Sequence, residues 1–316
     1  MRRETATQTA SLSLEDAGMD ASDGWPAACL MVVATPIGNL SDMSPRAHAA
    51  LRSATLVACE DRRVSRVLFD LSGLAPTTVC IEQHREAHAV AQVLEHLATG
   101  ARCALITDAG TPAISDPGHQ VVAAARRAGF PVLPVPGACA FVALASVAGF
   151  QPAPLWFEGF LPARDALMQA RLRQLLDLAA HVLIYEAPHR ISATAAALGH
   201  LAALRRLCVG RELTKLHEET AVLTGAAFAQ WVAAVPARMR GEYCVMIEAA
   251  KASGDDPSLP VNAKDRRYLL DREAMMIALL RELPPARAAR TMRRMTGDSQ
   301  TDWYRLALEL GGPPSY

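Results

Sequence analysis

Short apolar runs alternate with amphipathic stretches from Cys29 onward in this chain of 316 residues. The apolar runs are rich in Val, Ala, Leu and Cys and are bounded by Gly, Pro or Asp, which is typical of strands buried on both faces. The strands predicted in the first half are 30–34, 55–59, 78–81, 103–107 and 132–135. Helical spacing is found at 45–53, 64–71, 87–98 and 118–128. This alternation predicts a parallel α/β sheet covered by helices on both faces.

A second α/β block is expected in the middle of the chain. Strand patterns occur at 156–158, 182–185, 207–209 and 243–248. The helical patterns between them are 138–147, 165–178 and 191–204. The last 50 residues have helical patterns only, and they resemble a helix-turn-helix bundle. In this bundle, Pro285 suits a first helical position, Gly297 a C-terminal cap, and Ser299 or Thr301 an N-cap.

The predicted organisation has two α/β domains, 29–141 and 142–250, followed by a helical domain, 264–316. Residues 251–263 have the composition of a linker. Residues 1–28 are rich in Ser, Thr, Ala and Asp, and we expect them to form a flexible tail. Met19 is an alternative start.

The net charge argues against indiscriminate binding of nucleic acid, because 32 Lys and Arg balance 32 Asp and Glu. Between residues 264 and 310, however, there are ten basic and seven acidic residues, which gives a local net charge of +3. Arg287, Arg290 and Arg294 share one face of a predicted helix there. A solvated helix face and a phosphate-binding stripe are both compatible with this pattern.

The seven cysteines are scattered without a C-x-x-C pair, which favours buried reduced thiols in a cytoplasmic protein over disulfides or a zinc site. His84 with Glu82 and Glu86 lacks the spacing of a ligand set, so we expect no metal. The N-terminus has no apolar core typical of a signal peptide, and no apolar run approaches the roughly 18 residues that cross a bilayer. We therefore expect no membrane association.

Four loops at predicted strand ends carry the candidate chemistry. The sequence TDAGTPAISDPG at 107–118 is dense in Gly, Pro, Asp and Thr, and related loops occupy 34–40, 60–63 and 135–140. Each alone could be an ordinary strand-to-helix turn. In a parallel sheet these ends converge on one crevice, so together they predict a bound cofactor. Neither G-x-G-x-x-G nor G-x-x-x-x-G-K-[ST] is present.

Charged clusters end two strands of the second block, YEAPHR at 185–190 and RELTKLHEE at 211–219. Each alone is more often a surface salt-bridge network than a site. Their shared position at strand ends favours a cleft that faces the substrate. The cluster at 60–63 can equally be a capped helix start.

Taken in order, the motifs TPIGNL-D, ED-R, TDAGTPAISDPG, VPG-A, FEGFLP, YEAPHR and RELTK-EE span residues 35–219. This combination resembles the ribosomal RNA small subunit methyltransferase I family of the tetrapyrrole-methylase superfamily. The resemblance covers residues 29–250, with a looser match in the helical tail. It departs at Arg62, at Arg85 and in the loss of basic residues after Pro162.

The resemblance implies methyl transfer from S-adenosylmethionine to the ribose 2′-hydroxyl of a cytidine in the decoding region of 16S rRNA, within the 30S subunit, by a homodimer. It also implies that the cofactor lies in the cleft between the two α/β domains. The cofactor-binding residues it predicts, extended by Gly110 of the glycine loop, are Pro36, Ile37, Gly110, Thr111, Ile114, Cys139, Ala140 and Tyr185.

Proton removal from a ribose hydroxyl would be assisted by a base. The candidates, chosen from their place at strand ends, are Glu60, Asp108 and Glu186. The predicted substrate-binding cations are Arg63, Arg211, Lys215, Arg287, Arg290 and Arg294. Two alternatives stay open: a methyltransferase of this fold acting on a tetrapyrrole or another small acceptor, and a non-catalytic RNA-binding relative in which Arg62 or Arg85 obstructs the acceptor path.

Overall fold

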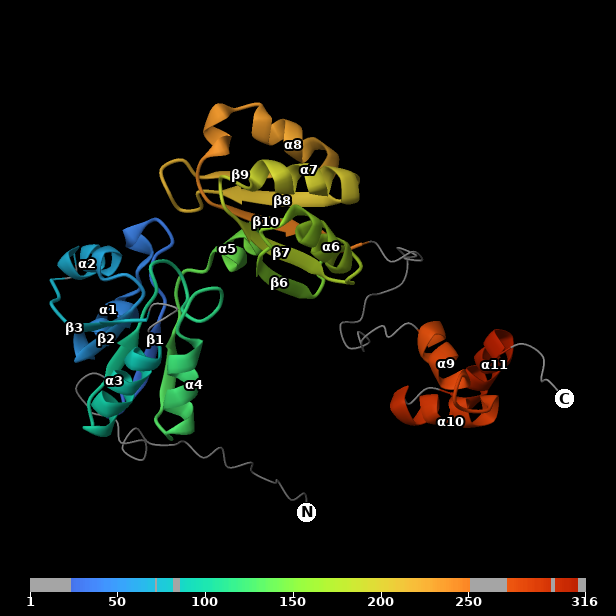
Figure 1. Ribbon diagram of the computed structural model, residues 1–316, viewed down its shortest axis with the longest axis horizontal. Coiled ribbons are helices and arrows are strands. Elements are labelled where there is room, and N and C mark those ends of the chain that lie inside the picture. Colours follow the sequence, from blue (N-terminus) through green and yellow to red (C-terminus); the bar gives the residue numbers. More distant parts are fainter. Residues whose placement is uncertain (1–23, 72, 82–85, 251–271, 297–298, 312–316) are drawn as a thin grey trace, which may run out of the picture. The chain divides into compact units, whose positions relative to one another are not determined.

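The computed structural model describes residues 24–71, 73–81, 86–250, 272–296 and 299–311. Its first sheet has five strands in the order β3-β2-β4-β1-β5, and every neighbouring pair is parallel (Figure 1). The strands are β1 (Leu30–Val33), β2 (Leu56–Cys59), β3 (Thr77–Cys80), β4 (Cys103–Leu105) and β5 (Val132–Val135). The parallel sheet predicted for the first half is confirmed.

Helices cover both faces of this sheet because the strands are apolar on both sides. Met31 and Val33 pack on one face with α1 (Pro45–Ser53) and α2 (Arg62–Leu71). Leu30 packs on the other with α3 (Glu86–Ala98) and α4 (His119–Arg127). All of these connections leave the carboxyl ends of the strands on one edge, where the predicted loops lie.

The second sheet is mixed, in the order β6-β7-β10-β8-β9. Its strands are β6 (Leu155–Phe160), β7 (His181–Glu186), β8 (Arg206–Arg211), β9 (Glu219–Thr224) and β10 (Tyr243–Ile247). Strand β10 is antiparallel to both of its neighbours, β7 and β8. The carboxyl ends of β7 and β8 therefore share an edge with the start of β10.

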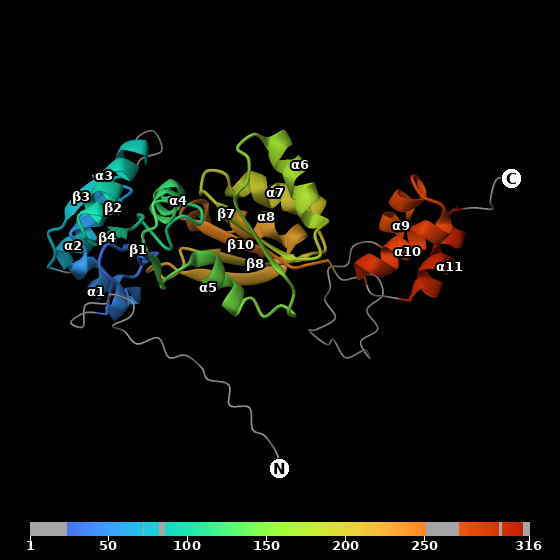
Figure 2. The ribbon, with the colours of Figure 1, turned by 90° about the horizontal axis from the view of Figure 1, so that it is seen from below.

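One helix covers one face of the second sheet, and three helices cover the other (Figure 2). The single helix is α5 (Ala140–Val147). The other three are α6 (Asp165–Leu176), α7 (Ile191–Leu201) and α8 (Gly225–Ala233). Two short 3₁₀ helices are also present: η1 (Leu40–Asp42) follows β1 in the first sheet's part of the chain, and η2 (Pro236–Met239) precedes β10.

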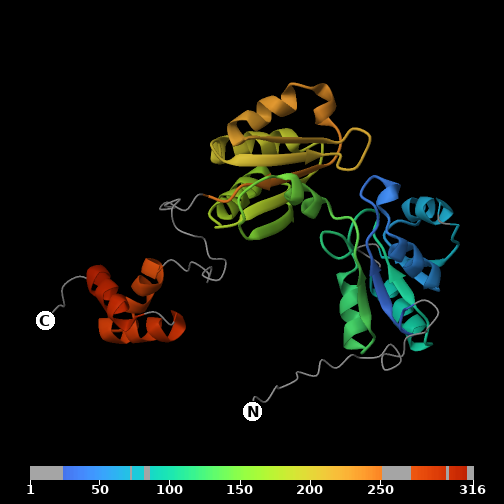
Figure 3. The same cartoon turned by 180° about the vertical axis from the view of Figure 1, so that it is seen from behind.

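The described residues after 252 form a compact unit of their own, which contains α9 (Arg272–Leu280), α10 (Pro285–Thr296) and α11 (Gln300–Gly311). Figure 3 shows these helices in orange and red. Their buried core includes Met276, Met292 and Trp303. Pro285 begins α10 as predicted, and Ser299 precedes α11; Gly297 lies outside the described residues.

The packed chain begins before the predicted boundary at residue 29. Trp25 is buried in the same core cluster as residues of α1 and α2, and Arg102 donates to the backbone carbonyls of Trp25 and Pro26. The Arg46 guanidinium also lies over the Trp25 ring, 4.6 Å from its centroid. The rest of the predicted tail, and the predicted linker from residue 251 on, lie outside the described residues.

All seven cysteines are free thiols, and five of them are buried. Within the described ranges, no helix has the length and apolar character needed to cross a membrane.

Candidate functional site

A cavity of ≈ 270 Å³ is lined by residues from the loop edges of both sheets. The first sheet contributes the loops after β1, β4 and β5. The second contributes the ends of β6, β7 and β8 and the start of β10. The predicted site residues that line the cavity are Ile37, Gly110, Thr111, Ile114, Cys139, Ala140, Tyr185, Glu186 and Lys215.

Hydrogen bonds hold three loops of the first sheet together, as the parallel arrangement predicts. The backbones of Thr35 and Gly110 exchange two hydrogen bonds, of 2.9 and 3.1 Å. The Thr35 hydroxyl donates to the Thr107 carbonyl, and the Thr111 hydroxyl donates to the Ala138 carbonyl. Gly110 has a φ of +81°, which glycine adopts without strain and which lets this bridge form.

The loop after β8 closes against the loop after β1. The backbone N–H of Asn39 donates to the Thr214 hydroxyl at 3.1 Å. A Cβ placed on Gly38 would lie 2.3 Å from Cγ of Lys215, so glycine is required for this approach. Thr214 itself has a positive φ of 67°, a strained conformation that is common at ligand sites.

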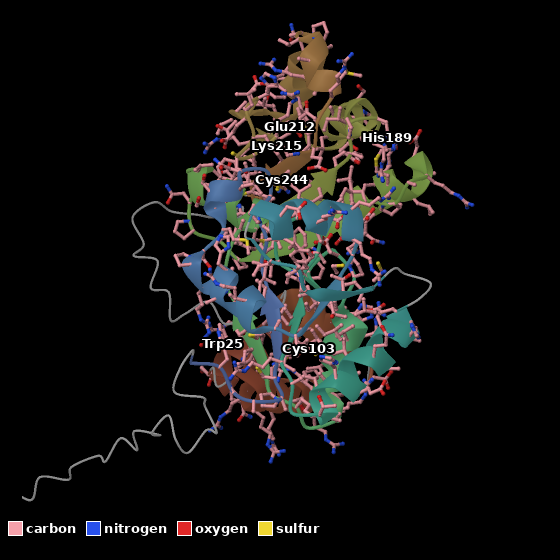
Figure 4. All side chains as sticks on the ribbon, turned by 90° about the vertical axis from the view of Figure 1, so that its left-hand side faces the viewer. Trp25, Cys103, His189, Glu212, Lys215 and Cys244 are labelled. Atoms are coloured by element: carbon pink, nitrogen blue, oxygen red, sulfur yellow. The ribbon has the colours of Figure 1, made fainter. Side chains whose placement is uncertain are left out.

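Lys215 is held by two carboxylates of the second sheet. Its Nζ lies 3.0 Å from Glu212 and 2.9 Å from Glu242. Burial lowers the pKa of Lys215, but these hydrogen bonds outweigh burial and raise the pKa above its usual value, so the ammonium stays charged. Figure 4 shows Glu212, Lys215 and Cys244 gathered together, with His189 apart from them. Of the predicted YEAPHR cluster, His189 is exposed and does not line the cavity.

Tyr185 and Phe160 line the cavity, and Phe157 and Phe141 belong to the same aromatic cluster. Tyr185 lies at the centre, with the rings of Phe157 and Phe160 at 5.0 and 5.8 Å between centroids. Phe141 stacks on Phe157 at 4.3 Å, and its backbone N–H donates to the Tyr185 hydroxyl. Burial raises the pKa of Tyr185, so this hydroxyl remains neutral.

Carboxylates gather at the ends of β2 and β4. The backbone N–H of Asp61 donates to Asp108 at 3.1 Å, and the N–H of Asp108 donates to Glu60 at 3.3 Å. Burial raises the pKa of both Glu60 and Asp108, and repulsion from neighbouring carboxylates adds to it. Neither lines the cavity; Asp116, on the same glycine loop, does. Burial also raises the pKa of Asp116.

No cluster of three or more His, Cys, Asp or Glu side chains in the described ranges is placed to hold a metal ion. Glu82 and His84 lie outside these ranges, as does Arg85.

Glu186, predicted as a base, has a fully buried carboxylate that is already bonded. It accepts from the Thr194 hydroxyl at 2.6 Å and from the Ala187 N–H at 2.8 Å. Arg190 Nε lies 3.2 Å from its Oε1. This carboxylate lines the cavity and is bonded to the start of α7.

Arg211, predicted to bind substrate, is buried and donates to backbone carbonyls. Its acceptors are Arg240, His217 and Ala237. The side chain therefore holds the segment before β10 against the end of β8.

Two arginines at the start of α2 also have local partners. Arg63 pairs with Asp61 at 2.7 Å while 90% of its side chain is exposed. The Asp61 carboxylate also accepts from the Arg63 backbone N–H, as in the interpretation of this cluster as a capped start of α2. Arg62 donates to the Thr78 carbonyl on β3. Arg62, named in the non-catalytic alternative, does not line the cavity. Pro36 is half-buried but does not line the cavity.

The remaining predicted cations lie on α10 of the separate helical unit. Arg287, Arg290 and Arg294 are exposed, as is Arg293. A surface hollow is lined by Arg290, Arg293, Arg294 and Gln300. The helical spacing placed Arg287, Arg290 and Arg294 on one face. It did not single out Arg293, which donates to Gln300.

Sequence reasoning also missed several lining residues of the main cavity. They are Ala109, Ser115, Asp116, Phe160, Ala187, Pro188, Glu212, Leu213, Glu242, Tyr243 and Cys244. The glycine loop itself was the available signal for Ser115 and Asp116. No local signal marked the residues around 242–244, because they reach the cavity only through the antiparallel insertion of β10.

Known proteins that resemble this chain agree with the motifs. Residues 30–229 match the family model of Tetrapyrrole (Corrin/Porphyrin) Methylases. Ribosomal RNA small subunit methyltransferase I from Mesorhizobium japonicum is 36% identical over 282 residues, covering 89% of this chain and 92% of the relative. The protein of that name from Pseudomonas aeruginosa is 38% identical over 287 residues, covering 90% and 99%.

Solved structures support the fold at lower identity. Cobalt precorrin-4 methyltransferase superposes with a TM-score of 0.52 at 14% identity, covering 70% of this chain and 95% of that one. The methyltransferase CobJ gives 0.51 at 20% identity, covering 70% and 94%. The predicted fold class and resemblance are confirmed: the chain belongs to the tetrapyrrole methylase family and, within it, to the ribosomal RNA small subunit methyltransferase I family.

Proposed function

We propose that this protein transfers a methyl group from S-adenosylmethionine to the ribose 2′-hydroxyl of a cytidine in the decoding region of 16S rRNA, within the 30S subunit. The observation that carries the proposal is the cavity in which glycine-containing loops of one sheet meet the charged strand ends of another. Relatives at 36–38% identity along nearly their whole length, named as small-subunit rRNA methyltransferases, support this substrate class. An enzyme with this substrate works in the cytoplasm.

The side chains of the cavity fit a positively charged nucleoside cofactor. Ile37, Ile114 and Tyr185 offer apolar surface for a purine ring. Asp116 lines the same space and forms no ion pair with a cation of the described residues. A carboxylate without a counter-ion favours a cationic ligand, which a sulfonium is. When bound, the cofactor supplies an electrophilic methyl group.

Within this proposal the chain has to orient the ribose and remove one proton. Positioning the hydroxyl oxygen in line with the methyl carbon lowers the barrier most, and the interlocked loops after β1, β4 and β5 supply a rigid frame for it. Asp108 and Glu60 do not line the cavity, but Asp108 directly precedes the lining residue Ala109 and its N–H donates to Glu60; burial raises the pKa of both carboxyls, so they are the proposed proton acceptors. Glu186 is bonded to Thr194 and Arg190 and serves better as a positioning residue.

Recognition of the RNA requires basic side chains outside the cavity. Arg290, Arg293 and Arg294 around their shared hollow can bind backbone phosphates. Lys215 is the cation of the cavity itself that could hold a phosphate or the ribose. A homodimer is part of the proposal, as in the family that the motifs resemble.

The test is methyl transfer from labelled S-adenosylmethionine by the purified protein to 30S subunits that lack the modification, followed by mapping of the labelled nucleotide. Label on a cytidine ribose of the decoding region is the expected result. Label on another nucleotide would correct the substrate position. Cofactor binding without transfer to the subunit would contradict the proposal, and transfer to a tetrapyrrole instead would favour the small-acceptor alternative.

A further inference from the structure

We infer that Phe160 is the platform on which the nucleobase of the acceptor nucleotide stacks, an inference that rests on the proposed RNA substrate. Phe160 is the last residue of β6, the edge strand of the second sheet, and it lines the cavity. Although the ring is apolar, 55% of its surface is exposed. The Tyr185 ring, at 5.8 Å and 65°, therefore covers only part of it. An exposed aromatic ring at the rim of a cavity is typical of a binding surface.

A β-bulge aims Phe160 at this cavity. Phe157 pairs with Leu183, but the next paired residue of β6 is Gly159, opposite Ile184, so Glu158 is extra. Gly159 has a φ of +73°, which favours glycine. Because side chains alternate along a strand, Phe157 and Phe160 would lie on opposite faces without the extra residue. The bulge brings both phenylalanines to the Tyr185 face.

Buried charged groups hold the end of β6 in place. Arg190 Nη2 donates to the carbonyls of Leu161 and Pro162, at 2.9 and 3.0 Å. Glu186 in turn fixes Arg190. The backbone just after Phe160 is thus fixed by a buried ion pair, and a fixed ring loses little conformational entropy when a ligand stacks on it.

A nucleobase is the ligand that fits this ring. Its ribose must reach the interior of the site, so the acceptor nucleotide has to leave the stack of its own strand. Stacking on an aromatic side chain compensates for that loss for any base, and the rim offers Ile114 as a second apolar contact, 51% exposed. Phe160 also belongs to the lining of the cavity proposed for the cofactor. A base stacked on this ring would therefore lie next to the cofactor, as methyl transfer between the two ligands requires.

The test compares the full-length protein with Phe160→Ala and Phe160→Trp. We measure kcat/KM on 30S subunits, the affinity for a decoding-region RNA in the presence of S-adenosylhomocysteine, the affinity for S-adenosylmethionine and the oligomeric state. Leu155→Ala is the matched control, because Leu155 is 52% exposed on the same strand and does not line the cavity. Phe160→Ala should lower kcat/KM and RNA affinity by about 5-fold to 100-fold, with unchanged cofactor affinity. Phe160→Trp should keep kcat/KM and RNA affinity near the wild-type values, and Leu155→Ala should leave both unchanged.

The inference is overturned by unchanged RNA affinity in Phe160→Ala, by an equal loss of cofactor affinity, or by a change of oligomeric state, which would identify the ring as a contact between copies. Turnover of the wild-type protein on subunits reports separately on the proposed function. The ratio of RNA affinities between variant and wild type tests the platform whether or not turnover occurs. A wild-type protein that binds no RNA would overturn both.

Discussion

Asp116 shows how much a single residue contributes to the character of the cavity. It lies on the glycine loop, half-buried, beside Cys139 and Tyr185, which burial keeps neutral. Asp116→Asn should weaken binding of S-adenosylmethionine by about 10-fold and binding of neutral S-adenosylhomocysteine far less, because only the former carries the sulfonium charge. Titration calorimetry with both ligands checks this. Asp165→Asn, at the start of α6, is the control. Equal losses for both ligands would mean that Asp116 acts through shape.

The proposed role of Asp108 as proton acceptor predicts a pH dependence of the reaction. A proton acceptor works in its ionised form, and burial raises the pKa of Asp108 above the usual 3.8. The single-turnover rate should therefore fall on acidification at a higher pH than an ordinary aspartate would give. Asp108→Asn should lower the rate by about 100-fold or more at saturating cofactor. If that variant kept the full rate while Glu60→Gln lost it, Glu60 would be the base.

Glu186 connects two elements through Arg190, which stands at the start of α7 and donates to the Leu161 carbonyl just after β6. Glu186→Gln should destabilise the protein by about 2 kcal/mol, less than for a fully buried pair because the Arg190 side chain is 19% exposed. This corresponds to a melting temperature lower by roughly 4–8 °C. Calorimetry measures the loss, and the folded variant should keep its single-turnover rate at saturating RNA. A rate loss of 100-fold without loss of stability would return Glu186 to the role of base.

The elements of the first sheet could be predicted from sequence because β1, β2 and β4 are continuous apolar runs and β3 and β5 are short β-branched or apolar runs between helical patterns. Strand β9 and helix α8 were missed. Along β9 every second residue is exposed, and the strand follows the charged segment 211–219, so its apolar signal is weak. The direction of β10 was also beyond reach, since a local pattern carries no information on which neighbours a strand pairs with.

The same distinction explains the site predictions. Residues on the glycine loop, such as Gly110 and Thr111, line the cavity, and the density of Gly, Pro, Asp and Thr in the loop was the signal that marked them. Arg211 and Glu186 stand at strand ends; the partners of Arg211 are backbone carbonyls that no sequence pattern reveals, whereas the partner of Glu186 is Arg190, four residues further on in the same motif. Phe160 was not predicted to line the cavity, although Gly159 beside it is a recognised signal for a bulge.

At the scale of the whole molecule, the balanced net charge hides an uneven distribution. The exposed arginines of α10 belong to a unit that is compact by itself. The double variant Arg290→Gln with Arg294→Gln should weaken binding to 30S subunits and reduce the slope of log affinity against log salt by about 1 for each phosphate that is no longer neutralised. Cofactor affinity should be unchanged, because these residues do not line the cavity. Filter binding at several salt concentrations measures the slope.

Arg281→Gln is the control for that experiment, since Arg281 is exposed but does not line the hollow of α10. An unchanged salt slope in the double variant would show that these arginines form a solvated face only.

The insertion of β10 between β7 and β8 has a consequence for synthesis on the ribosome. Glu242, Tyr243 and Cys244 complete the cavity, yet they are among the last residues of the second sheet to emerge. A nascent chain that has exposed every glycine loop still lacks this wall. Cofactor capture therefore cannot assist the early steps of folding, and a chain cut short before residue 243 should be unable to retain the ligand even when its first sheet is fully formed.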